Sequence, residues 1–237
     1  YALDEAQIIF FNGLHLEGKM VEILEGMAHK NKHTHAVTDS VDRALLRKTD
    51  YADIYDPHVW FDVIVWQEVS RYISKCLQEA LPEFKDDIEH NNSEWLKKLD
   101  ILHEYVMNNI AMIEPSQRIL ITAHDAFGYF GNRYGMQVEG LQGISTDAEI
   151  KMDDVARLAR IILDNNVKTI FVEQTISDRY LKGVKELVSS HKKSVSIGDQ
   201  LYSDALGEEG TGAETDEKMV RCNVDTIVKG LQSQWIV

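Results

Sequence analysis

Residues 118–130 read RILITAHDAFGYF, an apolar run that ends at a histidine and continues into an aromatic segment. The apolar part, 118–123, predicts a buried strand, and residues near 126–134 predict a helix. His124 therefore comes directly after the strand, where the chain turns towards the helix. Because ligands of open parallel sheets bind beyond the carboxyl ends of the strands, this position indicates a ligand-binding edge.

The rest of the second half repeats the same step from strand to helix. Further strands are predicted at 138–142, 169–173 and 194–197, and further helices at 152–165, 178–190 and 216–233. Alternation with short connections is typical of a parallel sheet with right-handed crossovers.

The first half begins with the same pattern. A strand at 8–11 ends at Asn12–Gly13, and a helix follows with apolar residues at helical spacing, namely Met20, Ile23, Leu24 and Met27. A short strand is possible near Ala36–Val37.

The pair Asp56–Pro57 predicts the start of the next helix. Asp accepts backbone N–H bonds as an N-cap, and Pro loses no hydrogen bond at the first helical position. We expect this helix to run to Leu81, where Pro82 ends it. Its expected buried side chains are Val63, Trp66, Val69, Ile73 and Leu77.

The longest periodic segment runs from about 84 to 113. Its apolar stripe consists of Ile88, Trp95, Leu99, Leu102, Val106 and Ile110. A helix of this length is on the order of 40 Å long, which is longer than one small lobe needs. We therefore expect an α/β protein with an N-terminal lobe (1–82), a linking helix (84–113) and a C-terminal lobe (114–237).

The composition narrows the function. The chain has 237 residues, of which 44% are hydrophobic, and a formal net charge of −14. This charge argues against nucleic acid or an anionic membrane surface as partner, and it suits either a cationic ligand or ordinary solubility. No apolar run approaches the roughly 18 to 20 residues of a membrane span. Cys76 and Cys222 have no CxxC partner and indicate neither a thiolate site nor a redox compartment.

Three side chains are candidate metal ligands: His58 in DPHVWFD, His124, and Asp204 in the loop after the fourth strand. Two imidazoles and a carboxylate form an incomplete set of ligands for a divalent transition metal. Each also has a simpler reading, because His58 could face solvent, His124 could cap the turn, and Asp204 could be a turn residue. Glu173 is either a carboxylate paired with a backbone amide or a partner that orients His124.

Other histidines are weaker candidates. His15 follows the first strand and could lie near a ligand site. His29, His33 and His35 form a cluster in a polar stretch with nearby lysines, which we interpret as a mobile surface loop.

Seven motifs together closely resemble the TroA-like solute-binding proteins, the metal-binding receptors of ABC importers (cluster A-I). These motifs are FFNGLHLE, DPHVWFDV, RILITAHDAFGYF, EGLQGIST, IFVEQTIS, YSDALG and MVRCNVDTIVKGL. The resemblance runs from about Ile8 to the end of the chain. It implies two α/β lobes joined by one rigid helix, with a Zn, Mn or Fe ion held in the cleft between them.

The resemblance also assigns ligands. The family's second, third and fourth ligands fall on His58, His124 and Asp204. Its first ligand is a histidine upstream of FFNGLHLE, so we expect the site within these residues to be one ligand short. The position that matches His15 is not a ligand in the family.

These features imply a monomeric, non-enzymatic receptor that delivers its metal to an ABC permease. It would be periplasmic or cell-surface, exported by a signal sequence not present in this chain. The alternatives are a metal-dependent hydrolase, in which one metal position stays open for water, and a metal-binding surface adhesin. No HExxH, GxSxG or P-loop motif occurs in the chain.

Overall fold

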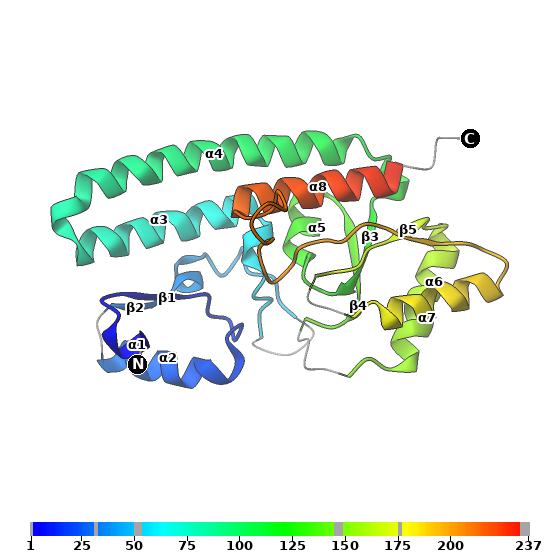
Figure 1. Ribbon diagram of the computed structural model, residues 1–237, viewed down its shortest axis with the longest axis horizontal. Coiled ribbons are helices and arrows are strands. Elements are labelled where there is room, and N and C mark those ends of the chain that lie inside the picture. Colours follow the sequence, from blue (N-terminus) through cyan, green and yellow to red (C-terminus); the bar gives the residue numbers. More distant parts are fainter. Residues whose placement is uncertain (1, 31–32, 50–53, 145–148, 175–176, 233–237) are drawn as a thin grey trace. The chain divides into compact units, whose positions relative to one another are not determined.

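The computed structural model in Figure 1 describes a set of segments that covers most of the chain, namely residues 2–30, 33–49, 54–144, 149–174 and 177–232. It divides into two compact units, residues 1–101 and 102–237. Both units contain short 3₁₀ helices, at Gly18–Met20, Val37–Ser40, Val59–Phe61, Pro82–Phe84 and Pro115–Gln117.

The first unit opens with a strand–helix–strand step. After α1 (Ala2–Glu5), strand β1 (Ile9–Phe11) pairs in parallel with β2 (Thr34–Ala36), and α2 (Val21–Lys30) connects them. The predicted strand and helix are confirmed, and β2 begins two residues before the expected position. Of the apolar residues predicted at helical spacing, Met20 lies just before α2, and Met20 and Ile23 are 48% and 56% exposed. The inward face instead follows Val21 and Leu24.

Helix α3 (Val63–Ala80) begins later than expected. Its N-cap is Asp62, whose carboxylate accepts the backbone N–H groups of Ile64 and Val65. The prediction that Asp56 caps this helix is wrong, because the Asp56 carboxylate is bound to other groups and the chain is not helical at Asp56. The predicted end before Pro82 is confirmed.

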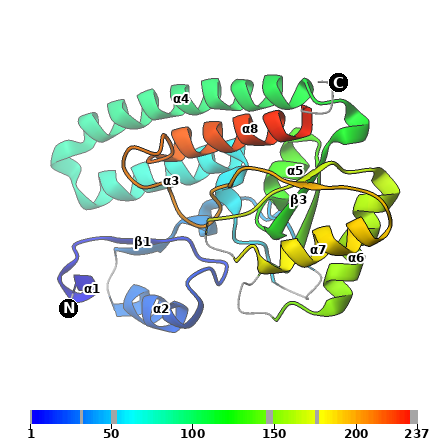
Figure 2. The same cartoon turned by 45° about the vertical axis from the view of Figure 1, so that its right-hand side comes forward.

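Helix α4 (Lys85–Ala111) runs beside α3 in Figures 1 and 2. Polar contacts join the two helices within the first unit: Gln67 Nε2 donates to Asp100 at 2.6 Å, and Trp95 Nε1 donates to Ser70 Oγ at 3.2 Å. Gln67 and Ser70 are both buried. Trp66, Ile73 and Leu77, which were predicted to be buried, are only half-buried.

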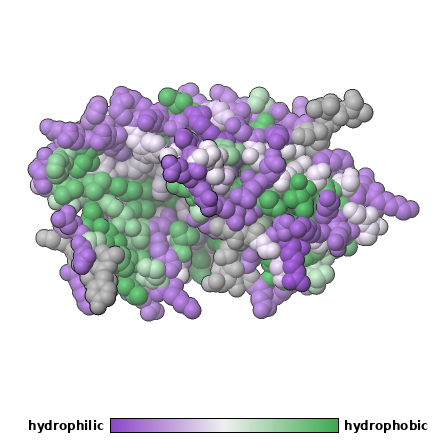
Figure 3. All heavy atoms as spheres, viewed as in Figure 1, coloured by the Kyte–Doolittle hydropathy of each residue, from purple (hydrophilic) through white to green (hydrophobic). Residues whose placement is uncertain are grey.

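The boundary between the units falls inside α4, between Ile101 and Leu102. Its apolar stripe is buried at Leu99 in the first unit and at Leu102, Val106 and Ile110 in the second, whereas Ile88 and Trp95 are half-buried. Hydrophilic residues predominate over α4 in Figure 3, along the top of the view.

The second unit confirms the predicted alternation. Strand β3 (Ile119–His124) pairs in parallel with β4 (Gln137–Gln142), and β5 (Thr169–Ile170) pairs in parallel with β6 (Ser196–Ile197). The backbone N–H of Phe171 donates to Ile121 O at 2.8 Å and links the two pairs. The helices are α5 (Gly128–Tyr134), α6 (Met152–Asn165), α7 (Arg179–Ser190) and α8 (Asp216–Gln232).

The core of this unit lies between the strands and the helices α6 and α7. It includes Ile121, Leu141, Leu158, Ile170 and Val184. All six residues of β3 are buried, which is expected of a parallel strand that is covered on both faces. Within the described residues, no helix is long and apolar enough to cross a membrane. The chain is therefore an α/β protein with parallel strands and one long helix.

Candidate metal centre

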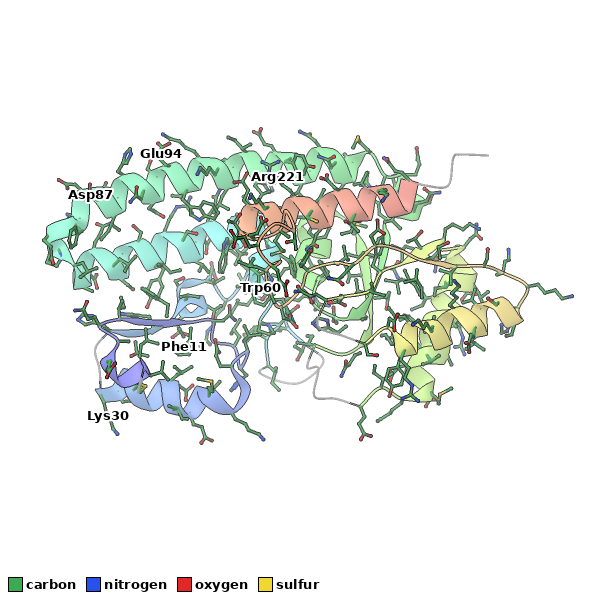
Figure 4. All side chains as sticks on the ribbon, viewed as in Figure 1. Phe11, Lys30, Trp60, Asp87, Glu94 and Arg221 are labelled. Atoms are coloured by element: carbon green, nitrogen blue, oxygen red, sulfur yellow. The ribbon has the colours of Figure 1, made fainter. Side chains whose placement is uncertain are left out.

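His58 directly precedes the short 3₁₀ helix Val59–Phe61, and only 2% of it is exposed. Oδ1 of the buried Asp56 accepts its backbone N–H at 3.0 Å and lies 2.7 Å from its Nδ1. Oδ2 of Asp56 binds Arg47 Nη1 at 2.8 Å. Trp60, labelled in Figure 4, packs edge-on against the imidazole with the ring centroids 5.3 Å apart.

A carboxylate can only accept hydrogen bonds, so the neighbour of Asp56 is the protonated Nδ1 of His58. The other ring nitrogen, Nε2, is then the one left for a metal ion. This is the arrangement by which a carboxylate orients a metal-ligating histidine.

The loop after β1 is hydrogen-bonded to the segment that carries His58. Asn12 Nδ2 donates to Pro57 O at 3.1 Å, directly before His58. Asn12 itself is fixed by Thr38 Oγ1, which donates to its carbonyl at 2.6 Å, and by Glu17 Oε1, which accepts its N–H at 2.6 Å. The FFNGLHLE motif therefore supports His58 through its asparagine.

His15 is exposed in the same loop, where Gly13, Leu14 and His15 all have positive φ angles. His29 ends α2, and His35 lies in β2 with Nδ1 3.4 Å from Tyr72 Oη and 3.6 Å from Cys76 Sγ. The interpretation of His29, His33 and His35 as one surface loop is therefore wrong, because the chain is regular at two of the three positions. Cys76 and Cys222 are both free thiols.

In the second unit, His124 is the last residue of β3 and is 0% exposed. Glu173 Oε1 accepts its backbone N–H at 2.8 Å, and Glu173 Oε2 lies 2.6 Å from its Nδ1. Glu173 thus combines both predicted roles, since one carboxylate binds the backbone amide and the imidazole of the same residue.

Asp204 lies in the loop between β6 and α8, with 28% of its side chain exposed. Its Oδ2 is 3.4 Å from His124 Nε2. The structure therefore brings His124 and Asp204 together within one unit, as their positions after two parallel strands predicted.

Opposing effects set the pKa of His124. Burial lowers it, but the contacts with Asp204 and Glu173 outweigh burial and raise the pKa of His124 to about 10. The imidazolium is then protonated on both nitrogens, with a proton on Nε2 facing Asp204. An incoming cation would take the place of that proton.

Buried aromatic side chains follow His124 in the sequence. Phe127 and Phe130 are buried next to it in sequence and pack edge to face, with centroids 6.4 Å apart. A dry surrounding strengthens the attraction between an ion and its ligands.

Sequence reasoning did not identify Asp56, Arg47 or Asn12 as supporting residues. For Asp56 a signal existed, because a carboxylate two residues before a histidine can reach both its N–H and its Nδ1. For Arg47 and Asn12 no local pattern could have shown the contact, since they lie 9 and 45 residues from their partners.

The chain is similar to known proteins over most of its length. A family model described as ZnuA, the periplasmic zinc-uptake complex component A, matches residues 1–230. The manganese-binding lipoprotein MntA of Bacillus subtilis is 38% identical over 230 residues, which cover 97% of this chain and 75% of MntA. The zinc-binding protein TroA of Treponema pallidum is 35% identical over 229 residues, which cover 97% of this chain and 74% of TroA.

Solved structures of related proteins also match this chain. The periplasmic zinc-binding protein TroA from Treponema pallidum matches with a TM-score of 0.93 at 35% identity, covering 97% of this chain and 82% of that one. Fe(III)-bound YtgA from Chlamydia trachomatis matches with a TM-score of 0.85 at 26% identity, covering 97% and 81%.

Proposed function

Because the chain belongs to the ZnuA family of zinc-uptake components, we propose that it captures one divalent transition-metal ion and delivers it to the permease of an ABC importer. In this role the ion is cargo, and the protein carries out no reaction on it. Members of this family are substrate-binding components of metal importers, so neither the hydrolase nor the adhesin is favoured.

The observation that carries the proposal is the pairing of His124 with Asp204. Their Nε2 and Oδ2 atoms are 3.4 Å apart. Two ligand atoms that each bind a tetrahedral ion at about 2.1 Å are separated by about 3.4 Å. The pair therefore has the spacing that one ion requires, while Glu173 occupies the opposite nitrogen of the imidazole.

We propose His58 as the third ligand. It lies in the first unit. The proposal is supported by the Asp56 carboxylate, which leaves Nε2 of His58 as the coordinating nitrogen, and by the DPH motif, which matches a ligand position of the family.

The ligand set restricts the metal to a class. Two imidazoles and one carboxylate suit Zn²⁺, Mn²⁺ and Fe²⁺. The affinities of these metals follow the same general order at most such sites. Related proteins are described as binding manganese, zinc or Fe(III). We propose that this chain carries one of these three metals.

We further propose that the protein acts as a monomer outside the cytoplasm, in the periplasm or at the cell surface, with the permease as its partner. The descriptions of its relatives as periplasmic proteins or lipoproteins support this location. The net charge of −14 disfavours nucleic acid as a partner.

Elemental analysis tests the proposed cargo. The wild-type protein and the His124→Ala variant are purified from the native source under low-metal conditions. We expect about one Zn, Mn or Fe ion per wild-type chain and far less in the variant, because one imidazole ligand is lost. Equal metal content in both proteins, or hydrolytic turnover by the zinc-loaded protein, would contradict the proposal.

A further inference from the structure

The loop that carries Asp204 is bound to the segment that follows β5 and carries Glu173. Leu201 N donates to Val172 O at 2.9 Å, and Gln174 N donates to Leu201 O at 3.1 Å. These two bonds form a parallel bridge opposite Glu173. One edge of the loop is thus fixed beside the residue that orients His124.

The other edge of the loop is fixed by a side chain. In an extended segment, the N–H and C=O groups of successive residues point to opposite edges. The groups of Tyr202 therefore face away from Val172 and Gln174, and both bind Asn223. Tyr202 N donates to Asn223 Oδ1 at 2.9 Å, and Asn223 Nδ2 donates to Tyr202 O at 2.7 Å.

Asn223 is well placed to hold the loop. It lies on α8, the helix on which Arg221 is labelled in Figure 4, and only 2% of it is exposed. Its Nδ2 also lies 3.2 Å from Met219 Sδ, one turn earlier in the helix. Both N–H groups of the amide thus have acceptors, and the amide cannot rotate without leaving a buried group unpaired.

We propose that Asn223 is a positioning residue of the metal site. Its amide takes the place of a neighbouring strand, so that Asp204, two residues after Tyr202, is held beside His124 Nε2 before the ion binds. This inference rests on the proposed function, in which Asp204 is a ligand. We call the two hydrogen bonds between Asn223 and Tyr202 the clamp. Without the clamp, metal binding must also order the loop, which lowers the affinity for the ion and speeds its release.

Two variants and a spectroscopic readout test the proposal. Asn223→Ala removes both hydrogen bonds to Tyr202. The isosteric Asn223→Asp keeps the acceptor for Tyr202 N but loses the NH2 group that donates to Tyr202 O and contacts Met219 Sδ, which keeps the test available if the alanine variant does not fold. We expect Kd for Co²⁺ to rise about 10-fold to 100-fold in both, as for other partners that support metal ligands. The visible absorption of bound Co²⁺ should also shift towards the spectrum of Asp204→Ala.

A matched control separates positioning from stability. Val224 is the next residue on α8 and is fully buried. Val224→Ala should lower the thermal midpoint while leaving Kd and the Co²⁺ spectrum as in the wild type. A merely structural Asn223 would behave in the same way.

The outcomes distinguish this inference from the proposed function. If His124→Ala binds Co²⁺ as tightly as the wild type, the proposed function is wrong. If His124→Ala loses binding but the folded Asn223 variants keep the wild-type Kd and spectrum, only the inference about Asn223 is overturned.

Discussion

Glu173 holds His124 at two nitrogen atoms, accepting the backbone N–H at 2.8 Å and lying 2.6 Å from Nδ1. Asp56 holds His58 in the same way in the other unit, at 3.0 Å and 2.7 Å. The two histidines come from different elements, since one ends a strand and the other precedes a helix. Each nevertheless has a buried carboxylate that contacts both the backbone N–H and Nδ1 of the ring.

Replacing Glu173 by Gln should weaken metal binding. The new amide can donate to Nδ1, which would favour the tautomer with the proton on Nε2 and block coordination. We expect Kd to rise about 10-fold to 100-fold, measured by competition with a chelating dye. Glu186→Gln removes the same charge from an exposed position on α7 and is the control. Equal metal affinities in the two variants would show that Glu173 does not support metal binding.

Metal binding should release a proton from His124. In the metal-free protein its pKa of about 10 keeps Nε2 protonated at pH 7.5, and the ion needs the lone pair of that atom. Titration calorimetry in buffers of different ionisation enthalpy should show the release of about one proton per ion. His191→Gln, which changes an exposed histidine, should leave this number unchanged. A binding enthalpy that is the same in all buffers would contradict the prediction.

The same raised pKa predicts how the stability of the metal-free protein depends on pH. The pKa of His124 rises from about 6.5 in the unfolded chain to about 10 in the folded one. The charged imidazole therefore stabilises the fold fully below about pH 6.5, and this contribution is lost as the pH rises to about 10. With a chelator present, the thermal midpoint should fall more steeply over this range in the wild type than in His124→Gln. Parallel curves would show that His124 is not held as a cation.

Gly140→Ala should destabilise the second unit beside His124. A Cβ at this position would lie 2.5 Å from Asp125 N and 2.7 Å from His124 C, which are backbone atoms that cannot turn aside. Overpacking of this kind typically costs about 1–3 kcal/mol, measured by chemical denaturation. Gly143→Ala is the control, because nothing lies within 4 Å of its Cβ. Similar losses in both variants would show that the close approach of β4 to His124 does not matter.

Sequence patterns predicted the second unit well, because its signals are local. The apolar run before His124 and the alternation of strands and helices needed only neighbouring residues. The ligand positions followed from the rule that parallel strands end at a common edge, which brings Asp204 to His124.

The errors have physical causes that a pattern cannot carry. Asp56–Pro57 has the residues of a helix start, yet Asp56 binds His58 and Arg47, and Asp62 caps the helix instead. The clamp of Asn223 on Tyr202 joins residues 21 positions apart, so only the folded chain shows it. On α2, helical spacing alone did not separate the buried Leu24 from the exposed Ile23, because both fit the same period.

The central proposal is that His58, His124 and Asp204 bind one ion. The most direct test is a competition titration with a chelating dye on the wild type, His58→Ala and Asp204→Ala. The account predicts that each variant loses at least about tenfold in affinity, equivalent to about 1.4 kcal/mol, with a single ion per wild-type chain. Wild-type affinity in both variants would contradict it.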